Sequence, residues 1–360
     1  MAKIKVAVIF GGTSGEHNIS LLSAERVIEN IPKDKYEVLP IGITEKGRWF
    51  YYPGDLSMLE TGEWEKNPDC TCAIASPDTI HSGIIKLEGN AHSNTKVDVV
   101  FPLVKGMNGE DGAIQGILEM AGIPFVGSRH TAAAVCMDKD FTKAILSNSG
   151  IKTARWTAVD ISEISHLHEK CDEISEMFNF PVFVKPASSG SSIGVNKVYD
   201  RETLEDALKL AFTHGRKAIV EEFIDGRELE CAVLGNDSPK AMAVGEIKLA
   251  PNSEFFDYNT KYLMPFTTAG VPAEINRQTE EKVKELAVKA YKIMGCSGFA
   301  RVDFFLNKNN EIILNEINTA PEFISGGMYE AIMNYMGIPF TELLDKLIML
   351  AFDRAGITLD

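Results

Sequence analysis

Two carboxylates, an amide and a guanidinium lie close together in one short segment, residues 298–321. The two apolar runs of this segment flank a turn at residues 307–310, a pattern that predicts a β-hairpin. Side chains alternate between the two faces of a strand, so four polar side chains are expected to share one face of this hairpin. These are Arg301, Asp303, Glu316 and Asn318.

The expected register pairs Leu306 with Glu311 across the turn, and therefore Arg301 with Glu316. Because the side-chain period is two, a shift of one residue would move every side chain of one strand to the other face. The shared polar face thus depends on this register.

Charged side chains on a sheet face need a counterion, since unpaired buried charges are costly. Magnesium takes oxygen ligands, uses one or two carboxylates, keeps waters and is completed by substrate phosphates. Asp303, Glu316 and Asn318 are therefore candidate magnesium ligands. Arg301 would stabilise negative charge beside them. The alternative interpretation is the solvent-facing polar side of an ordinary hairpin.

The length of 360 residues predicts two or three domains with a sizeable core. Hydrophobic residues make up 45% of the chain and charged residues 24%, which indicates a globular protein. The net charge of -15 disfavours nucleic acids and anionic membranes as partners, although a local basic site can still hold a phosphate group.

The apolar run within residues 1–10 is too short for a signal peptide, and no stretch approaches the ~18 apolar residues of a membrane span. We therefore expect a cytoplasmic protein with small-molecule partners. Six cysteines are too few for a disulfide scaffold, and Cys70 and Cys72 have no second pair or nearby His for zinc. Free thiols are expected.

The start of the chain has an α/β pattern. A strand expected at residues 5–10 ends in Gly11-Gly12, and an amphipathic helix is expected at residues 19–31. Neither G-x-G-x-x-G nor G-x-x-x-x-G-K-[ST] occurs, so two common phosphate motifs are excluded. Glu16 lies near the helix start, where its carboxylate either suits the helix dipole or binds an ammonium group in a cleft.

Residues 50–95 show little periodicity, so mostly loop is expected between strands at residues 38–43 and 97–101. A Gly-rich acidic loop at residues 105–112 then enters a helix at residues 113–122. Such a loop is expected at the carboxyl end of a parallel strand, where open α/β sheets bind ligands.

A second Gly-rich loop, residues 186–194, follows a strand expected at residues 180–185. It lies between two strands, so its backbone N–H groups could fold over phosphates while Lys185 contributes a point charge. The alternative is a flexible surface hairpin loop. Lys139 lies in a helix expected at residues 131–149.

The remaining expectations concern the second half of the chain. The irregular stretch at residues 251–272 is long and aromatic, which predicts a lid. The segment around Glu221 and Ile224 has the form of a strand end whose backbone meets an adenine edge. Further helices are expected at residues 200–214, 280–294 and 339–352, and further strands at residues 218–222, 228–234 and 242–249.

These motifs resemble those of the D-alanine–D-alanine ligase family of the ATP-grasp superfamily. The resemblance covers essentially the whole chain, and its motifs occur in the family's order. The matching segments are Phe10–Glu16, Asn108–Gly116, Met137–Lys139, Lys185–Pro186, Gly190–Gly194, Phe256–Tyr258, Lys261–Tyr262, Arg301–Asp303 and Asn315–Thr319.

The resemblance implies an α/β, three-domain ATP-grasp architecture. Its N-terminal domain, residues 1–128, would hold an open parallel sheet. A central subdomain, residues 129–220, and a C-terminal domain, residues 221–360, would hold ATP between two antiparallel sheets. Two Mg²⁺ ions, replaceable by Mn²⁺, and a homodimer are also implied.

The implied reaction is ATP-dependent joining of two D-alanines for peptidoglycan of the cell wall. One carboxylate attacks the γ-phosphate to give an acyl phosphate, and the amine of a second amino acid attacks the acyl carbon. Arg301 and the backbone N–H of residue 322 would hold the resulting oxyanion. Residues implied to contact ATP are Lys139, Lys185, Ser192, Glu221, Ile224 and Glu228.

The resemblance also implies that Glu16 binds the ammonium group of the first substrate. A hydrogen-bonded set of Glu16, Ser191 and Tyr262 would couple the N-terminal domain to the lid. Closure would protect the acyl phosphate from water. The tyrosine at position 262 favours an amine over a hydroxyl nucleophile.

The acceptor side departs from the family pattern. Glu322 stands where the family has glycine, and Lys105 stands where it has histidine. Gly327, before Met328, replaces a serine whose hydroxyl usually holds the acceptor carboxylate in the family. A lost charge-assisted hydrogen bond costs ~1.5–3 kcal/mol, so D-alanine is expected to bind the acceptor site less well.

Two interpretations of the acceptor side are open. In one, Lys105 or Lys261 holds the acceptor carboxylate, while Glu322 pairs with Lys105 or binds a cationic group of a different acceptor. In the other, Glu322 points into solvent.

Two other functional classes are weighed against the sequence. A non-catalytic ATP-binding relative would lack metal ligands, and all three candidate ligands are present. A nicotinamide dehydrogenase would need the dinucleotide Gly pattern, which is absent.

Overall fold

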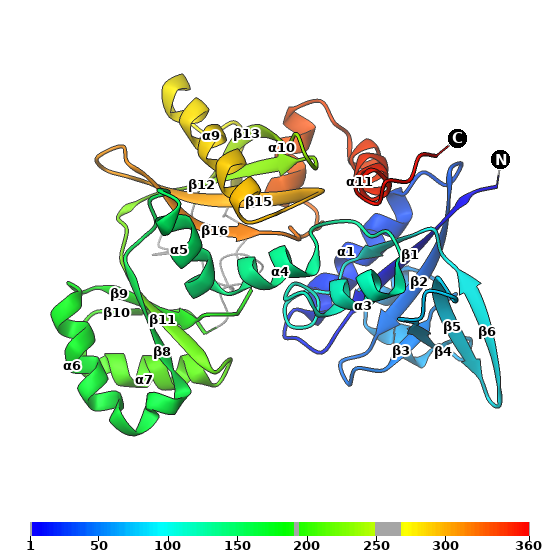
Figure 1. The fold of residues 1–360 in the computed structure, drawn as a ribbon, viewed down its shortest axis with the longest axis horizontal. Helices are drawn as coiled ribbons and strands as arrows, with labels where there is room; N and C mark the ends of the chain where they lie inside the picture. The colour runs from blue at the N-terminus through cyan, green and yellow to red at the C-terminus, as the bar shows by residue number, and fades with distance from the viewer. Residues whose placement is uncertain (1, 191–193, 249–267, 360) are drawn as a thin grey trace.

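The chain forms three β-sheets with helices packed on them (Figure 1). The structure, a computed structural model, describes residues 2–190, 194–248 and 268–359. The sheets follow one another along the chain, so the predicted α/β class is confirmed.

The first sheet has seven strands in the order β6-β5-β4-β3-β2-β1-β7. Its core strands β2, β1 and β7 are parallel, as predicted, and the other four add antiparallel neighbours. The strands are β1 (Ile4–Gly11), β2 (Tyr36–Ile43), β3 (Trp49–Tyr51), β4 (Thr71–Ala75), β5 (Gly83–Glu88), β6 (Ala91–Lys96) and β7 (Val99–Pro102). The helices of this region are α1 (His17–Asn30), α2 (Ser57–Glu60), η1 (Glu63–Lys66) and α3 (Ala113–Ala121).

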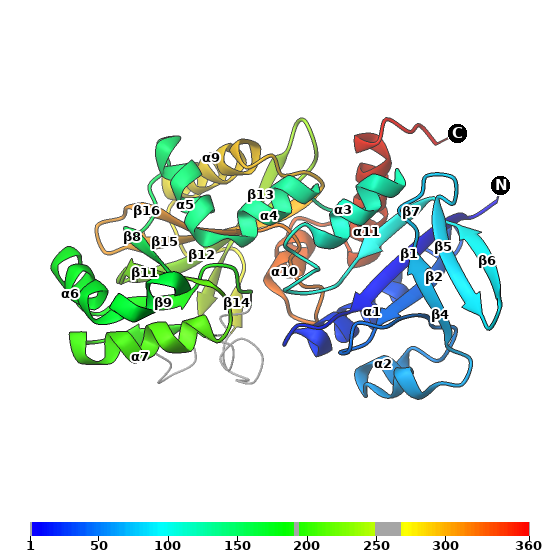
Figure 2. The same ribbon diagram turned by 60° about the horizontal axis from the view of Figure 1, so that its bottom comes forward.

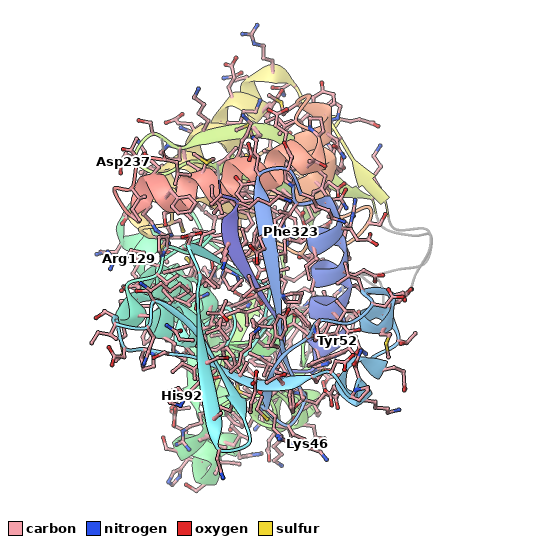
Figure 3. All side chains as sticks on the ribbon, turned by 90° about the vertical axis from the view of Figure 1, so that its right-hand side faces the viewer. Lys46, Tyr52, His92, Arg129, Asp237 and Phe323 are labelled. Carbon is pink, nitrogen blue, oxygen red and sulfur yellow. The ribbon has the colours of Figure 1, made fainter. Side chains whose placement is uncertain are left out.

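The expectation of mostly loop at residues 50–95 is wrong. Four short strands and two helical turns occupy much of it, and the buried Trp64 packs edge-on against Phe10 and Tyr52. The strands are short, and the edge strand β6 is almost entirely exposed, so no apolar alternation marks them. His92 of β6 is labelled at this outer edge in Figure 3.

The central sheet has four antiparallel strands in the order β10-β9-β11-β8. Helices α6 and α7 cover the face that points away from the C-terminal sheet (Figures 1 and 2). The strands are β8 (Trp156–Asp160), β9 (Val182–Pro186), β10 (Asn196–Val198) and β11 (Lys217–Glu222). The helices are η2 (Ile161–His166), α6 (Leu167–Met177) and α7 (Arg201–Phe212).

The single helix expected at residues 131–149 is two helices, α4 (His130–Met137) and α5 (Lys139–Asn148). Asp138 separates them, because its extended backbone ends α4 while its carboxylate accepts hydrogen bonds from Asp140 N and Phe141 N of α5. The break places Lys139 at the first turn of α5.

The C-terminal sheet has the order β14-β13-β12-β15-β16. Helix α9 packs on one face of this sheet. Helix α10 packs on the other face, where it contacts β12 and β13. The strands are β12 (Gly226–Leu234), β13 (Lys240–Lys248), β14 (Thr268–Gly270), β15 (Phe299–Asn307) and β16 (Ile312–Asn318). The helices are α9 (Arg277–Ile293), α10 (Met328–Tyr335) and α11 (Phe340–Arg354).

The core of the N-terminal sheet continues into α10 and α11, so the two ends of the chain pack together. Phe323, labelled beneath α11 in Figure 3, stacks on Phe299 at 5.6 Å and meets Phe101 at 5.9 Å. This buried aromatic contact anchors the segment that follows β16, which carries Glu322.

Across the described ranges, no helix has the length and apolar character needed to cross a bilayer. All six cysteines are free thiols, as expected.

Candidate active site

The hairpin β15–β16 forms, but with a register that differs from the predicted one. Leu306 pairs with Ile312 rather than Glu311, and Asp303 rather than Arg301 stands opposite Glu316. The turn is one residue longer than expected, because the Asn307 side-chain oxygen accepts hydrogen bonds from the N–H groups of residues 309 and 311.

A β-bulge at Asn315 compensates for this shift. Phe304 pairs with Leu314 and Asp303 with Glu316, so Asn315 is an extra residue in β16. The bulge directs Leu314 into the core and sets Glu316 opposite Asp303. The four predicted polar residues therefore still share one face, with Arg301 opposite Asn318.

Arg301 is buried among carboxylates. Its Nε and Nη2 donate to the two oxygens of Asp303, each at 2.8 Å, and Nε lies 2.9 Å from Glu230 Oε2. Its Nη1 is 3.6 Å from Glu322 Oε2. Burial lowers the pKa of Arg301, but Asp303 and Glu230 outweigh it and raise that pKa well above its ordinary value.

Glu230 is a site residue that the sequence reasoning missed. It lies on β12 directly opposite Asp303 and is 1% exposed. An acidic residue inside an otherwise apolar strand was the available signal, because buried carboxylates need partners.

The donor set fits magnesium in part. Asp303 and Glu316 supply facing carboxylates, and Asn318 Oδ1 accepts from Ala320 N at 3.0 Å. Among the described residues, no group of three or more His, Cys, Asp or Glu side chains is arranged to hold a metal ion by itself. Two carboxylates and an amide suit an ion whose shell is completed by phosphates and water.

A cleft of about 500 Å³ lies between the central and C-terminal sheets. Its walls come from β9 and β11 on one side and from β12, β13, β15 and β16 on the other. Among the predicted ATP-contacting residues, those in this lining are Lys139, Lys185, Glu221, Ile224 and Glu228.

The two predicted lysines of the cleft are held by different partners. Lys139 Nζ donates to the Ser189 carbonyl at 2.7 Å and lies 3.3 Å from Glu316. Lys185 Nζ lies 2.6 Å from Glu221, in a nearly buried ion pair. Burial lowers the pKa of Lys185, but Glu221 and Glu316 outweigh it and raise that pKa.

Glu221 also pairs with Lys143, which the sequence analysis did not identify. Lys143 Nζ lies 2.7 Å from Glu221 Oε1. Burial raises the pKa of Glu221, but Lys143 and Lys185 outweigh it and lower that pKa to about 2. Burial lowers the pKa of Lys143, and the nearby Glu221 opposes this effect. The Glu221 side chain thus faces two lysines.

A second, smaller pocket of about 50 Å³ adjoins the cleft. Glu16 lies in its wall, close to two backbones: a Cβ at Gly106 or Gly190 would be 2.5 or 2.6 Å from Glu16 Oε2. The carboxylate of Glu16, at the start of α1, therefore lies next to both Gly-rich loops. The acceptor-side residues in the lining are Lys105 and Glu322.

Of the two roles considered for Glu322 in the first interpretation, the pairing with Lys105 is not formed. Lys105 Nζ lies 2.8 Å from Glu110 and donates to the Ala320 carbonyl. Glu322 is 13% exposed in its side chain and faces Arg301, so the solvent-facing alternative is wrong as well. Lys105 and Glu110 belong to the same loop, so this pair is closer in sequence than a pair of Lys105 with Glu322 would be.

Gly327 and Met328 line neither the cleft nor the smaller pocket. Gly327 precedes α10, and the buried Met328 has its sulfur against Gly245. Four predicted residues lie outside the described ranges: Ser191, Ser192, Lys261 and Tyr262.

The two antiparallel sheets that enclose the cleft have the arrangement of the ATP-grasp fold, which the similar solved ligases share. Family models described as D-ala D-ala ligase N-terminus and C-terminus match residues 5–128 and 145–349. The chain belongs to the D-alanine–D-alanine ligase family.

Individual relatives show how close this likeness is. The chain is 45% identical to the D-alanine–D-alanine ligase of Acetivibrio thermocellus, over 98% of this chain and 96% of the relative. It is similar to the crystal structure of VanG D-Ala:D-Ser ligase from Enterococcus faecalis, with a TM-score of 0.88, 40% identity and coverage of 97% and 100%. The D-alanine–D-alanine ligase of Coxiella burnetii matches with a TM-score of 0.83, 32% identity and coverage of 99% and 96%.

Proposed function

We propose that this protein is an ATP-dependent, ADP-forming ligase that joins D-alanine to a second small D-amino acid for peptidoglycan precursors. The observation that carries the proposal is that the cleft and the smaller pocket share a wall. Lys139, Ser189, Gly190 and Glu316 line both spaces. A nucleotide in the cleft would thus present its phosphates to an amino acid in the pocket.

The residues of the cleft suit a polyphosphate. Lys139 and Lys185 supply positive charge, and Ile224 and Glu228 line the part of the cleft away from the pocket. Ser192 is assigned to the phosphates as well. Bound Mg²⁺, as two ions replaceable by Mn²⁺, would neutralise phosphate charge, held by Asp303, Glu316 and Asn318.

The donor amino acid is assigned to the pocket beside Glu16. Its ammonium group would bind that carboxylate, and its own carboxylate would point toward Lys139 and the phosphates. Ser191 and Tyr262 would complete this side of the site. Arg301 would stabilise the oxyanion of the second step by directing Nη1 toward the negatively charged oxygen.

We expect the acceptor to be a small D-amino acid, as in the ligases that this chain resembles. Its carboxylate would have to compete for cations that already face carboxylates, since Lys105 faces Glu110 and Arg301 faces Glu322. We therefore expect weak binding of D-alanine as acceptor, with Lys261, Gly327 and Met328 on the same side. Similar proteins are named D-alanine–D-alanine ligase in one case and D-Ala:D-Ser ligase in another.

We also propose how the chain is divided into domains, how it assembles and where it acts. Domain boundaries near residues 128 and 220, a homodimer and a cytoplasmic site of action are expected. The retained pair of facing carboxylates at Asp303 and Glu316 favours a working enzyme over a non-catalytic ATP-binding relative.

The test is ADP formation from ATP and Mg²⁺ with D-alanine alone, followed by mass analysis of products with D-alanine, D-serine and glycine as acceptors. Hydroxylamine traps an acyl phosphate as a hydroxamate, which reports donor activation separately from acceptor use. D-alanine-dependent hydroxamate and a dipeptide product are expected. A purified, folded protein that forms neither would refute the proposal.

A further inference from the structure

A buried ion cluster behind the nucleotide cleft contains a lysine with no assigned role. Lys143 lies on α5, 1% exposed, with Nζ 2.7 Å from Glu221 Oε1. The other oxygen of the same carboxylate lies 2.6 Å from Lys185 Nζ. Glu221 and Lys185 line the cleft, and Lys143 lies behind them. One carboxylate on β11 is therefore shared by two ammonium groups from α5 and β9.

The charges of this cluster do not cancel. Lys143 and Lys185 contribute two positive charges and Glu221 one negative charge, so the cluster carries a net charge of about +1. Lys185 also feels the negative charges of Glu316 and Glu228. Without Lys143, the full negative charge of Glu221 would offset the positive charge of Lys185, and less of that positive charge would be available to bind a phosphate.

A purely structural role does not account for this arrangement. A Lys185–Glu221 pair would already satisfy both charges, and burying a further ammonium group costs free energy. Lys139 and Lys143 are four residues apart on α5, so both extend from the same side of the helix. The helix thus supplies one cation to the cleft wall and a second one behind it.

We propose that Lys143 is a nucleotide-positioning residue: it shares Glu221 with Lys185 and so leaves the charge of Lys185 available to the phosphates of ATP. The inference rests on the proposed function, because it assumes that ATP occupies the cleft. Lys143 itself touches no phosphate. It acts through Glu221 and Lys185.

The test compares binding of ADP and of adenosine by calorimetry in the presence of Mg²⁺. Lys143→Met removes the charge and keeps much of the side-chain volume. The double variant Lys143→Met with Glu221→Gln removes one charge of each sign and restores the net charge of the cluster. Lys152→Met is the matched control, because Lys152 is an exposed lysine paired with Glu311.

Lys143→Met is expected to weaken ADP binding about ten-fold and to leave adenosine binding unchanged. In the Glu221→Gln background, Lys143→Met is expected to change ADP affinity by less than about three-fold, because Lys143 acts through Glu221. Equal loss of ADP and adenosine binding, or a further ten-fold loss of ADP affinity in the double variant relative to Glu221→Gln alone, would show a structural role only and overturn the inference. Lys143→Gln, which also removes the charge but keeps a polar group beside Glu221, replaces the methionine variant if that variant does not fold.

The outcomes separate this inference from the proposed function. If the wild-type protein binds neither ADP nor ATP, the proposed function fails. If the wild type binds ADP and Lys143→Met binds it equally well, only the role of Lys143 fails.

Discussion

Asp303 and Glu316 stand directly opposite each other on β15 and β16, and the bulge at Asn315 brings them together. In a regular ladder continuing from the Phe304 pair, Asn315 would face Asp303, and Glu316 would stand opposite the buried Val302. A carboxylate would then point into the core. One extra residue in β16 therefore decides whether Glu316 lies on the proposed metal-binding face or is buried in the core.

This relationship predicts the effect of Glu316→Gln. Loss of one facing carboxylate should lower kcat by roughly 10²–10³-fold and raise the Mg²⁺ concentration needed for half-maximal rate. Steady-state ADP formation across a Mg²⁺ titration measures both. Glu311→Gln, on the exposed turn of the same hairpin, is the control and should behave like the wild type. An unchanged Mg²⁺ dependence in Glu316→Gln would argue against the metal assignment.

The low pKa of Glu221 predicts a pH-dependent contribution to stability. Because its pKa is lowered from 4.5 to about 2 in the folded protein, the ionised carboxylate stabilises the fold fully above pH 4.5 and progressively less as pH falls toward 2. At neutral pH, Glu221→Gln should be about 3–5 kcal/mol less stable than the wild type, the range for breaking a buried ion pair. Urea unfolding of both proteins between pH 7 and pH 3 measures the difference, which should narrow below pH 4.5. A difference independent of pH would contradict the lowered pKa.

The position of Glu322 predicts how the acceptor site responds to its removal. Glu322→Gly should lower the acceptor KM for D-alanine by roughly ten-fold, because the variant frees Arg301 Nη1 and removes a repulsive carboxylate. The KM for ATP should not change, since Glu322 does not line the large cleft. Initial rates at varied D-alanine, with the donor site saturated, give this value. An acceptor KM equal to that of the wild type would show that Glu322 does not oppose the acceptor carboxylate.

The aromatic contact around Phe323 predicts a stability effect at the junction between the N-terminal sheet and the C-terminal helices. Phe323→Ala should cost about 3–5 kcal/mol of unfolding free energy, the range for deleting a fully buried phenylalanine. Chemical denaturation measures the loss. Phe141→Ala is the comparison, because Phe141 is 54% exposed and should cost far less. Similar costs for the two variants would mean that Phe323 is not a packing anchor.

Local patterns were enough for much of the fold. The apolar runs and glycine turns predicted β1, β2, β9 and β11 to within about two residues, because a strand or turn is specified mainly by its own side chains. The same reasoning failed at residues 50–95 and overlooked β8, α6 and α10. Those elements are short or weakly periodic, and their stability comes from the sheet or core that they join.

By itself, the sequence determined which chemical groups this protein possesses: oxygen ligands on one hairpin, a lysine before the Gly-rich loop at residues 186–194, a second lysine at position 139, and a carboxylate at the start of α1. Only the tertiary structure decided how they are paired. Glu221 lies between Lys143 and Lys185, Arg301 lies among Glu230, Asp303 and Glu322, and Lys105 faces Glu110. The reason is that an ion pair depends on the distance between side chains in space. Strand register and a single bulge set that distance for residues far apart in the chain.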